Sequence, residues 1–221
     1  MVTFTNASSV VRDERGFTLI ELLVASMVTM MVLGGAVALT SQVQSGYRRQ
    51  VESAAAEQEG RYALEWIGKL IRGAGNNPFN LASTNCPTAG TVFRAIRFDP
   101  DADGVDDDIR LQTDSNPPDG QLGGMGSCTQ ANEDVTISLD PANRAVVFLD
   151  NNLGGSASIR TDAVVDDLRF VYRDSNHAVT AVPADVIYVE TQITIRTRTV
   201  DSSTSVPATR VLSSEVRVRS R

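Results

Sequence analysis

The chain has 221 residues and a formal net charge of −7, which allows one or two domains. An acidic chain is repelled by phosphate backbones, so we expect no general binding to nucleic acid. The sequence contains no His-Glu-x-x-His, Gly-x-Ser-x-Gly, Cys-x-x-Cys or phosphate-binding glycine loop, and its one histidine, His177, lies in a turn-like segment. We therefore expect a protein that is not an enzyme.

Residues 17–40 form an apolar run with one charged residue, Glu21. A helix of about 20 apolar residues crosses a bilayer, so this run is long enough to span a membrane. Arg12 and Arg15 precede it, which places its N-terminal side in the cytoplasm. An unpaired acid inside a membrane helix costs on the order of 2.5–3.5 kcal/mol, so Glu21 is expected to have a function.

The helical pattern continues through residues 41–75 with an amphipathic character. The apolar residues that recur at steps of three and four are Tyr62, Trp66, Ile67, Leu70 and Ile71. This stripe predicts a helix face that packs on a sheet. Gly73, Gly75 and Pro78 supply stop signals, so one long helix is expected to run from about residue 17 to residue 73.

Residues 76–221 change to the alternating pattern of strands. The segments with this pattern, or with a short apolar run, are 91–98, 135–139, 145–149, 168–172, 187–195 and 210–219. Turns rich in Asn, Asp, Gly and Pro separate them. Helix first and strands afterwards predict the α+β class, with an antiparallel sheet head packed on the amphipathic half of the helix.

The segment Gly16-Phe17-Thr18-Leu19-Ile20-Glu21-Leu22-Leu23 resembles the processing site of type IV prepilins and of type II secretion pseudopilins. The resemblance implies a leader of residues 1–16, cleavage by a prepilin peptidase between Gly16 and Phe17, and N-methylation of the new Phe17 amine. It also implies storage in the inner membrane with a periplasmic head, and then assembly with other pilins or pseudopilins. The alternative is an ordinary signal anchor in which Glu21 is accidental.

Residues 57–64, 71–75 and 167–173 resemble PilW-type minor pilins and the larger minor pseudopilins. Many major pilins carry a proline in the apolar run at the position where this chain has Ala38, which argues against a bulk filament subunit. The first interpretation is therefore a minor pilin that helps to initiate or tip a type IV pilus. The alternatives are a minor pseudopilin of a type II secretion system and a tip adhesin or DNA-uptake module.

Residues 17 and 21 share a helix face, so the Phe17 ammonium that cleavage creates can pair with Glu21 within one chain. The resemblance implies pairing with Glu21 of a neighbouring subunit, which would set the axial register in the filament. Gly16 has a separate role, because a peptidase that approaches the backbone closely requires a residue without a β-carbon.

Cys86 and Cys128 are the only cysteines. An oxidising compartment favours a disulfide between them. The alternative is two free buried thiols.

Residues 99–108 contain six aspartates. Aspartates at alternate positions followed by Gly104 are typical of a calcium loop, in which Asp99, Asp101, Asp103 and Asp107 offer carboxylates and Val105 a carbonyl. Arg110 occupies the position where an EF-hand requires glutamate, and the flanking segments have strand patterns, so we do not expect an EF-hand. The alternatives are a smaller calcium loop and a solvated acidic hairpin tip; the expected function requires no other cofactor.

Overall fold

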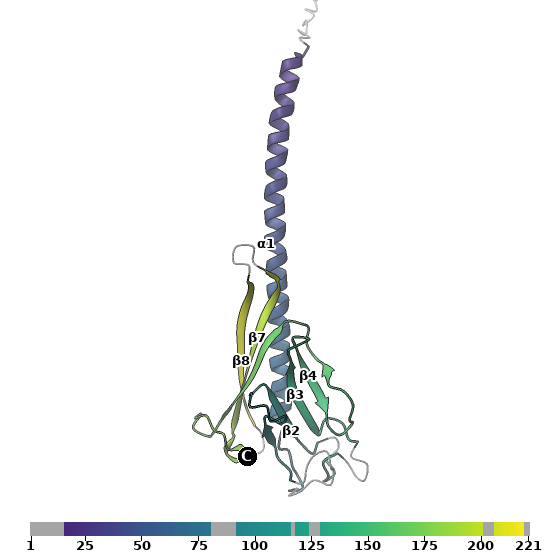
Figure 1. Cartoon of the computed structure of the whole chain (residues 1–221), viewed down its shortest axis with the longest axis vertical. Helices are drawn as coiled ribbons and strands as arrows, with labels where there is room; N and C mark the ends of the chain where they lie inside the picture. The colour runs from purple at the N-terminus through teal and green to yellow at the C-terminus, as the bar shows by residue number, and fades with distance from the viewer. Residues whose placement is uncertain (1–15, 81–91, 116–117, 124–128, 201–205, 219–221) are drawn as a thin grey trace, which may run out of the picture. The chain divides into compact units, whose positions relative to one another are not determined.

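The computed structural model describes residues 16–80, 92–115, 118–123, 129–200 and 206–218 (Figure 1). The chain divides into two compact units, Met1–Arg48 and Arg49–Arg221. The first unit contains the beginning of one long helix, and the second contains the rest of that helix and all strands of the described residues.

Helix α1 extends over Leu19–Gly73, which confirms the predicted single helix to within two residues at its start. The chain leaves the helix where the amide of Ala74 donates to the carbonyl of Leu70, and Gly75 then adopts a φ of 75°. A positive φ is accessible to glycine at little cost, so Gly75 explains why the helix stops here.

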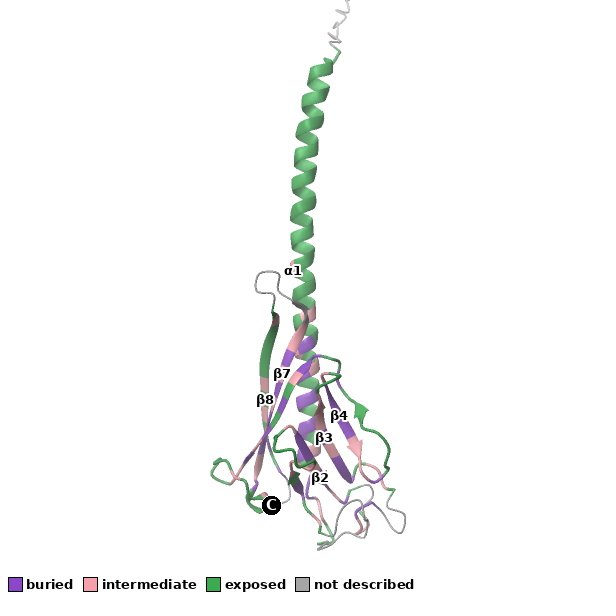
Figure 2. Ribbon diagram, in the orientation of Figure 1, coloured by how far each residue is buried: buried purple, intermediate pink, exposed green. Residues whose placement is uncertain are grey.

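From Ala56 onward, one face of α1 is buried (Figure 2). Its buried residues are Ala56, Gly60, Ala63, Leu64, Ile67, Gly68 and Ile71. Trp66 and Leu70 pack against this core from its edge. The prediction for Tyr62 is wrong, because 56% of this residue is exposed. Tyr62 lies five residues before Ile67, which is well over one turn of 3.6 residues, so the two side chains point in different directions.

The head contains two antiparallel sheets where a single sheet was expected. The five-stranded sheet has the order β1-β2-β3-β4-β5, and its strands are Ile96–Phe98, Asp108–Gln112, Asp134–Asp140, Ala145–Asp150 and Ser158–Ile159. The three-stranded sheet has the order β6-β7-β8, and its strands are Val165–Arg173, Tyr188–Val200 and Pro207–Arg217. A short 3-10 helix, η2, covers Pro183–Asp185. The α+β class is confirmed.

The strands predicted from the sequence are present, but of the first predicted segment, 91–98, only Ile96–Phe98 forms a strand, β1. Val92 is exposed and outside the strand, and Thr91 lies outside the described residues. Two strands, β2 and β5, were not assigned from sequence. The residues of β2 alternate between polar and apolar, but the run is short and contains only two apolar side chains, Ile109 and Leu111, so the strand signal is weak.

One hydrophobic core joins α1 to both sheets. Ile67 and Ile71 of α1, Ile137 of β3, Phe170 of β6 and Ile193 of β7 are all fully buried in it. Helix and sheets each contribute an apolar face that neither can bury alone, so packing of this part of the chain depends on all three elements.

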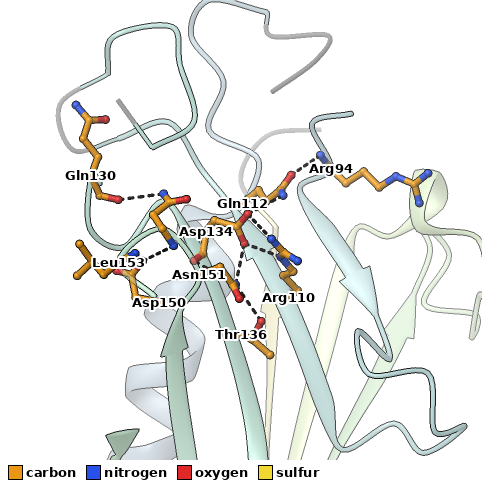
Figure 3. A network of polar contacts seen from close by, with 10 residues as sticks. Arg94, Arg110, Gln112, Gln130, Asp134, Thr136, Asp150, Asn151 and Leu153 are labelled. Atoms are coloured by element: carbon orange, nitrogen blue, oxygen red, sulfur yellow. Dashed lines mark hydrogen bonds and ion pairs between the residues drawn. The ribbon is translucent and has the colours of Figure 1, made fainter. Parts of the chain in front are cut away.

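A polar network lies at one end of the five-stranded sheet (Figure 3). Asp134 at the start of β3 accepts hydrogen bonds from Arg110 and Gln112 of β2 and from Asn151, which follows β4. Asn151 also donates to Thr136 over 3.1 Å. Together these donors satisfy the carboxylate of Asp134, which is fully buried.

Candidate assembly segment and acidic loop

Thr18 and Glu21 form a reciprocal capping arrangement at the start of α1. The backbone amide and the hydroxyl of Thr18 each donate to Glu21 Oε2 over 3.1 Å, and the amide of Glu21 donates to the Thr18 hydroxyl oxygen over 3.3 Å. This is a capping box, in which the first residue before the helix and the third residue inside it satisfy each other's free amides. Glu21 therefore has a structural role as well as the charge that the sequence drew attention to.

Sequence reasoning missed this cap, although its signal is present. A threonine followed three residues later by glutamate, just before an apolar run, is the usual signature of a capping box. The sequence analysis considered only the charge of Glu21 in the apolar run and did not consider its pairing with Thr18.

Gly16 and Phe17 lie at the beginning of the described residues, directly before the cap. A β-carbon placed on Gly16 would meet no atom within 4 Å, and its φ is not in the left-handed region. Nothing in the described part of the chain therefore requires glycine at this position. Phe17 is 87% exposed.

The first part of α1 leaves its large apolar side chains exposed within the chain (Figure 2). Among the described residues, α1 is the one helix that is long and apolar enough to cross a membrane, and none of its most apolar stretch is buried. An exposed apolar surface of this extent is unfavourable in water, so a lipid or protein environment is needed to cover it.

Cys86 and Cys128 lie outside the described residues, so their pairing stays a prediction.

The acidic loop connects β1 and β2, which pair at Phe98 and Ile109. Within it Asp99 accepts the amides of Asp103 and Gly104, each over 3.0 Å. Gly104 has a φ of 84°, which the tight turn requires. The amide of Val105 donates to Asp103 over 2.8 Å. The loop is thus an ordered turn between two strands.

Three carboxylates of this region converge. One oxygen from each of Asp99, Asp101 and Asp108 lies within 4.8 Å of the other two. The carboxylates of Asp103 and Asp107, which were also proposed as ligands, are not part of this group, and the role of the Val105 carbonyl stays a prediction. Asp108 was not among the ligands expected from the sequence, because the spacing of a calcium loop selected the preceding residue, Asp107.

Burial distinguishes Asp108 from its neighbours. Only 3% of Asp108 is exposed. Its burial, together with the negative charge of Asp101, raises the pKa of the Asp108 carboxyl to about 7. The pKa of Asp107 is also raised, first by burial and then by the charges of Asp103 and Asp101.

An aromatic pair lies beside the loop. Phe98 of β1 stacks on Tyr172 of β6, with ring centroids 3.7 Å apart. Burial and then the charges of Asp106, Asp108 and Asp99 raise the pKa of the Tyr172 hydroxyl. The amide of Phe170 donates to the carbonyl of Asp106 over 2.8 Å. The acidic loop therefore contacts both sheets of the head.

His177 lies at the surface of the head. Its Nδ1 is 3.2 Å from a carboxylate oxygen of Glu215, and its ring stacks on Tyr188 with centroids 4.2 Å apart. About half of its side chain is exposed. These contacts with Glu215 and Tyr188 account for the position of His177 on the surface of the head.

Residues 11–37 match the family model of the prokaryotic N-terminal methylation motif. The chain therefore carries the signature of type IV prepilins and pseudopilins, as the sequence predicted. The matched segment includes Gly16, Phe17, the Thr18–Glu21 cap and the first turns of the exposed apolar helix. No curated protein and no solved structure matches the chain.

Proposed function

We propose that this chain is a minor pilin that is incorporated into a type IV pilus and takes part in initiating or tipping its assembly. A prepilin peptidase removes residues 1–16, and Phe17 becomes the N-methylated first residue. Before assembly the mature chain is held in the inner membrane by residues 17–40, with the head in the periplasm. Its partners are the peptidase and other pilins.

The observation that carries this proposal is the methylation motif at the start of a helix whose apolar residues are exposed. Such a surface needs a membrane before assembly and similar helices afterwards. Gly16 supports the same conclusion. Because no packing within the described residues requires a glycine there, its absence of a β-carbon is best explained by an external partner that approaches the backbone.

Glu21 supplies the electrostatic step of assembly. Cleavage creates an ammonium at Phe17, one residue before Thr18, whose amide already donates to the Glu21 carboxylate. A carboxylate and an ammonium that pair in an apolar environment relieve each other's desolvation. Pairing between Glu21 of one subunit and the amine of the next would fix the axial register of the new subunit.

The choice of a minor subunit depends on Ala38 and on the resemblance of residues 57–64, 71–75 and 167–173. Helix α1 passes through Ala38 without interruption. A minor pseudopilin of a type II secretion system carries the same motif, so it is the second candidate. The genes next to this one distinguish the two, since pilus and secretion components are encoded in different clusters.

Mass spectrometry of the N-terminus of the protein purified from its own cells tests processing. We expect a chain that begins at N-methylated Phe17. The companion experiment compares Glu21→Ala with Glu65→Ala, a control acid in the same helix that forms an exposed pair with Lys69. Both variants should be processed, but only Glu21→Ala should be lost from sheared filaments. An intact Met1 in cells with an active prepilin peptidase would contradict the proposal.

A further inference from the structure

We propose that Asp99, Asp101 and Asp108 bind one calcium ion at the junction of the β1–β2 loop with strand β2. This set keeps Asp99 and Asp101 of the sequence-based loop and replaces the carboxylates of Asp103 and Asp107 by that of Asp108. It is a structural site in the head, independent of the membrane segment and of the proposed role in assembly.

The separation of the three carboxylates fits a shared ion. Calcium takes oxygen ligands at about 2.3–2.6 Å, so two ligand atoms on the same ion lie at most about 5 Å apart. The three oxygens lie within 4.8 Å of one another, which meets this limit. Side chains from both ends of the loop reach the same point, since Asp99 begins the loop and Asp108 begins β2.

A second observation is that the carboxylate of Asp108 is buried and lacks a hydrogen-bond partner at one of its oxygens. Asp108 is 3% exposed, and the oxygen without a partner is Oδ1. A buried acceptor with no donor is costly, and the cost is larger when the group is charged. A cation bound by the three carboxylates would neutralise their mutual repulsion and compensate the buried charge of Asp108.

The chemistry of the site favours calcium over other ions. All three proposed ligands are hard carboxylate oxygens, which suit calcium better than the softer transition metals. Asp101 is exposed, which leaves room for the water ligands that complete a coordination of six to eight oxygens. Magnesium requires a nearly ideal octahedron at shorter distances, whereas calcium tolerates an irregular set.

The consequence of binding follows from the position of the loop. The loop joins β1 to β2 of the five-stranded sheet, and Asp106 accepts the amide of Phe170 from β6 of the other sheet. An ion that ties Asp99 to Asp108 closes the loop between these two contacts. Calcium should therefore stabilise the junction of the two sheets.

The test uses the full chain in detergent micelles, stripped with EGTA and then dialysed against radioactive calcium with excess magnesium present. We expect one bound calcium per chain and a higher melting temperature. Asp101→Asn and Asp108→Asn should each lower the affinity at least about tenfold, because losing a ligand costs more than losing a residue that only supports a ligand. Asp185→Asn is the control, since it removes one exposed negative charge in η2, outside the loop.

The variants also separate binding from folding. Asp101 is exposed, so Asp101→Asn should leave the circular dichroism spectrum in EGTA unchanged, and a loss of binding by that variant cannot be attributed to misfolding. No bound calcium in the wild-type chain at about 10 mM, well above the range of extracellular calcium modules, would overturn the proposal. Full calcium affinity in Asp101→Asn and Asp108→Asn would overturn it as well. Neither result bears on processing at Gly16.

Discussion

Arg110 and Asp134 form a two-point ion pair between strands β2 and β3 (Figure 3). Nε of Arg110 donates to Oδ1 of Asp134 over 2.6 Å, and Nη2 donates to Oδ2 over 2.7 Å. The side chain of Asp134 is fully buried, and 14% of that of Arg110 is exposed. Gln112 and Asn151 supply two further hydrogen bonds to the same carboxylate. The pair is thus buried and surrounded by donors.

Removing one partner of this pair should destabilise the head strongly. Asp134→Ala removes the carboxylate that pairs with the largely buried Arg110 guanidinium, and removing one member of a buried ion pair costs about 3–5 kcal/mol. Chemical denaturation of the full chain in micelles, followed by the fluorescence of the single tryptophan, Trp66, measures the change. Glu65→Ala is the control, since it breaks an exposed pair with Lys69 and should leave the midpoint unchanged. Equal midpoints for wild type and Asp134→Ala would show that the pair contributes nothing.

The small size of Gly60 permits close contact between α1 and the three-stranded sheet. A β-carbon on Gly60 would lie 2.8 Å from Cδ1 of Leu212 and 2.9 Å from Cγ2 of Ile195. Gly60→Ala should therefore lower stability by about 1–3 kcal/mol through overpacking, less the gain in helix propensity of about 1 kcal/mol. Gly46→Ala is the matched control in the same helix, because its β-carbon would meet no atom within 4 Å. A more stable Gly60→Ala chain would contradict the close contact.

The face of α1 that packs on the head can be measured with two residues. Ile67 is fully buried, so Ile67→Ala should cost about 2–5 kcal/mol. Tyr62 is mostly exposed, so Tyr62→Ala should cost much less, in contrast to the face expected from the sequence. Denaturation midpoints of the two variants decide the matter. If Tyr62→Ala were the more damaging change, the orientation of α1 described above would be wrong.

The two roles of Glu21 can be separated because glutamine also serves in a capping box. Glu21→Gln keeps the cap with Thr18 but removes the charge, so it should be processed yet be depleted from sheared filaments. Thr18→Ala keeps the charge but removes the hydroxyl that accepts the amide of Glu21, so it should still be incorporated. Immunoblots of filament and membrane fractions give both results. Depletion of Thr18→Ala with normal incorporation of Glu21→Gln would assign the effect to the cap instead of the charge.

Local patterns were sufficient for the long helix, for most strands and for the processing motif. Each of these depends on residues that are close in sequence, such as the apolar run after Gly16 or the alternation around Phe170. Strand β2 was missed although Asp108–Gln112 alternates polar and apolar residues, because this run is only five residues long and contains just two apolar side chains. The division into two sheets could not be predicted, because the sequence of a single strand does not show which distant strand it pairs with.

The acidic loop shows how a shift of one residue changes a candidate site. Sequence spacing placed Asp107 among the expected ligands, whereas in the structure it is Asp108 whose carboxylate lies close to those of Asp99 and Asp101. Side chains on a strand alternate between its two faces, so the residue at which β2 begins decides which aspartate points inward. That starting point is set by the pairing of Asp108 with Ser138 of β3, thirty positions along the chain.

By itself, the sequence determined that the chain has a long apolar helix with one acid near its start and a methylation motif over residues 11–37, because both features depend on contiguous residues. Only the tertiary structure decided that Ile67 and not Tyr62 faces the core, that Arg110 reaches Asp134, and that Asp108 joins Asp99. The physical reason is that burial and ion pairing depend on groups brought together from distant parts of the chain, and their free energies exist only once the sheets have packed on the helix.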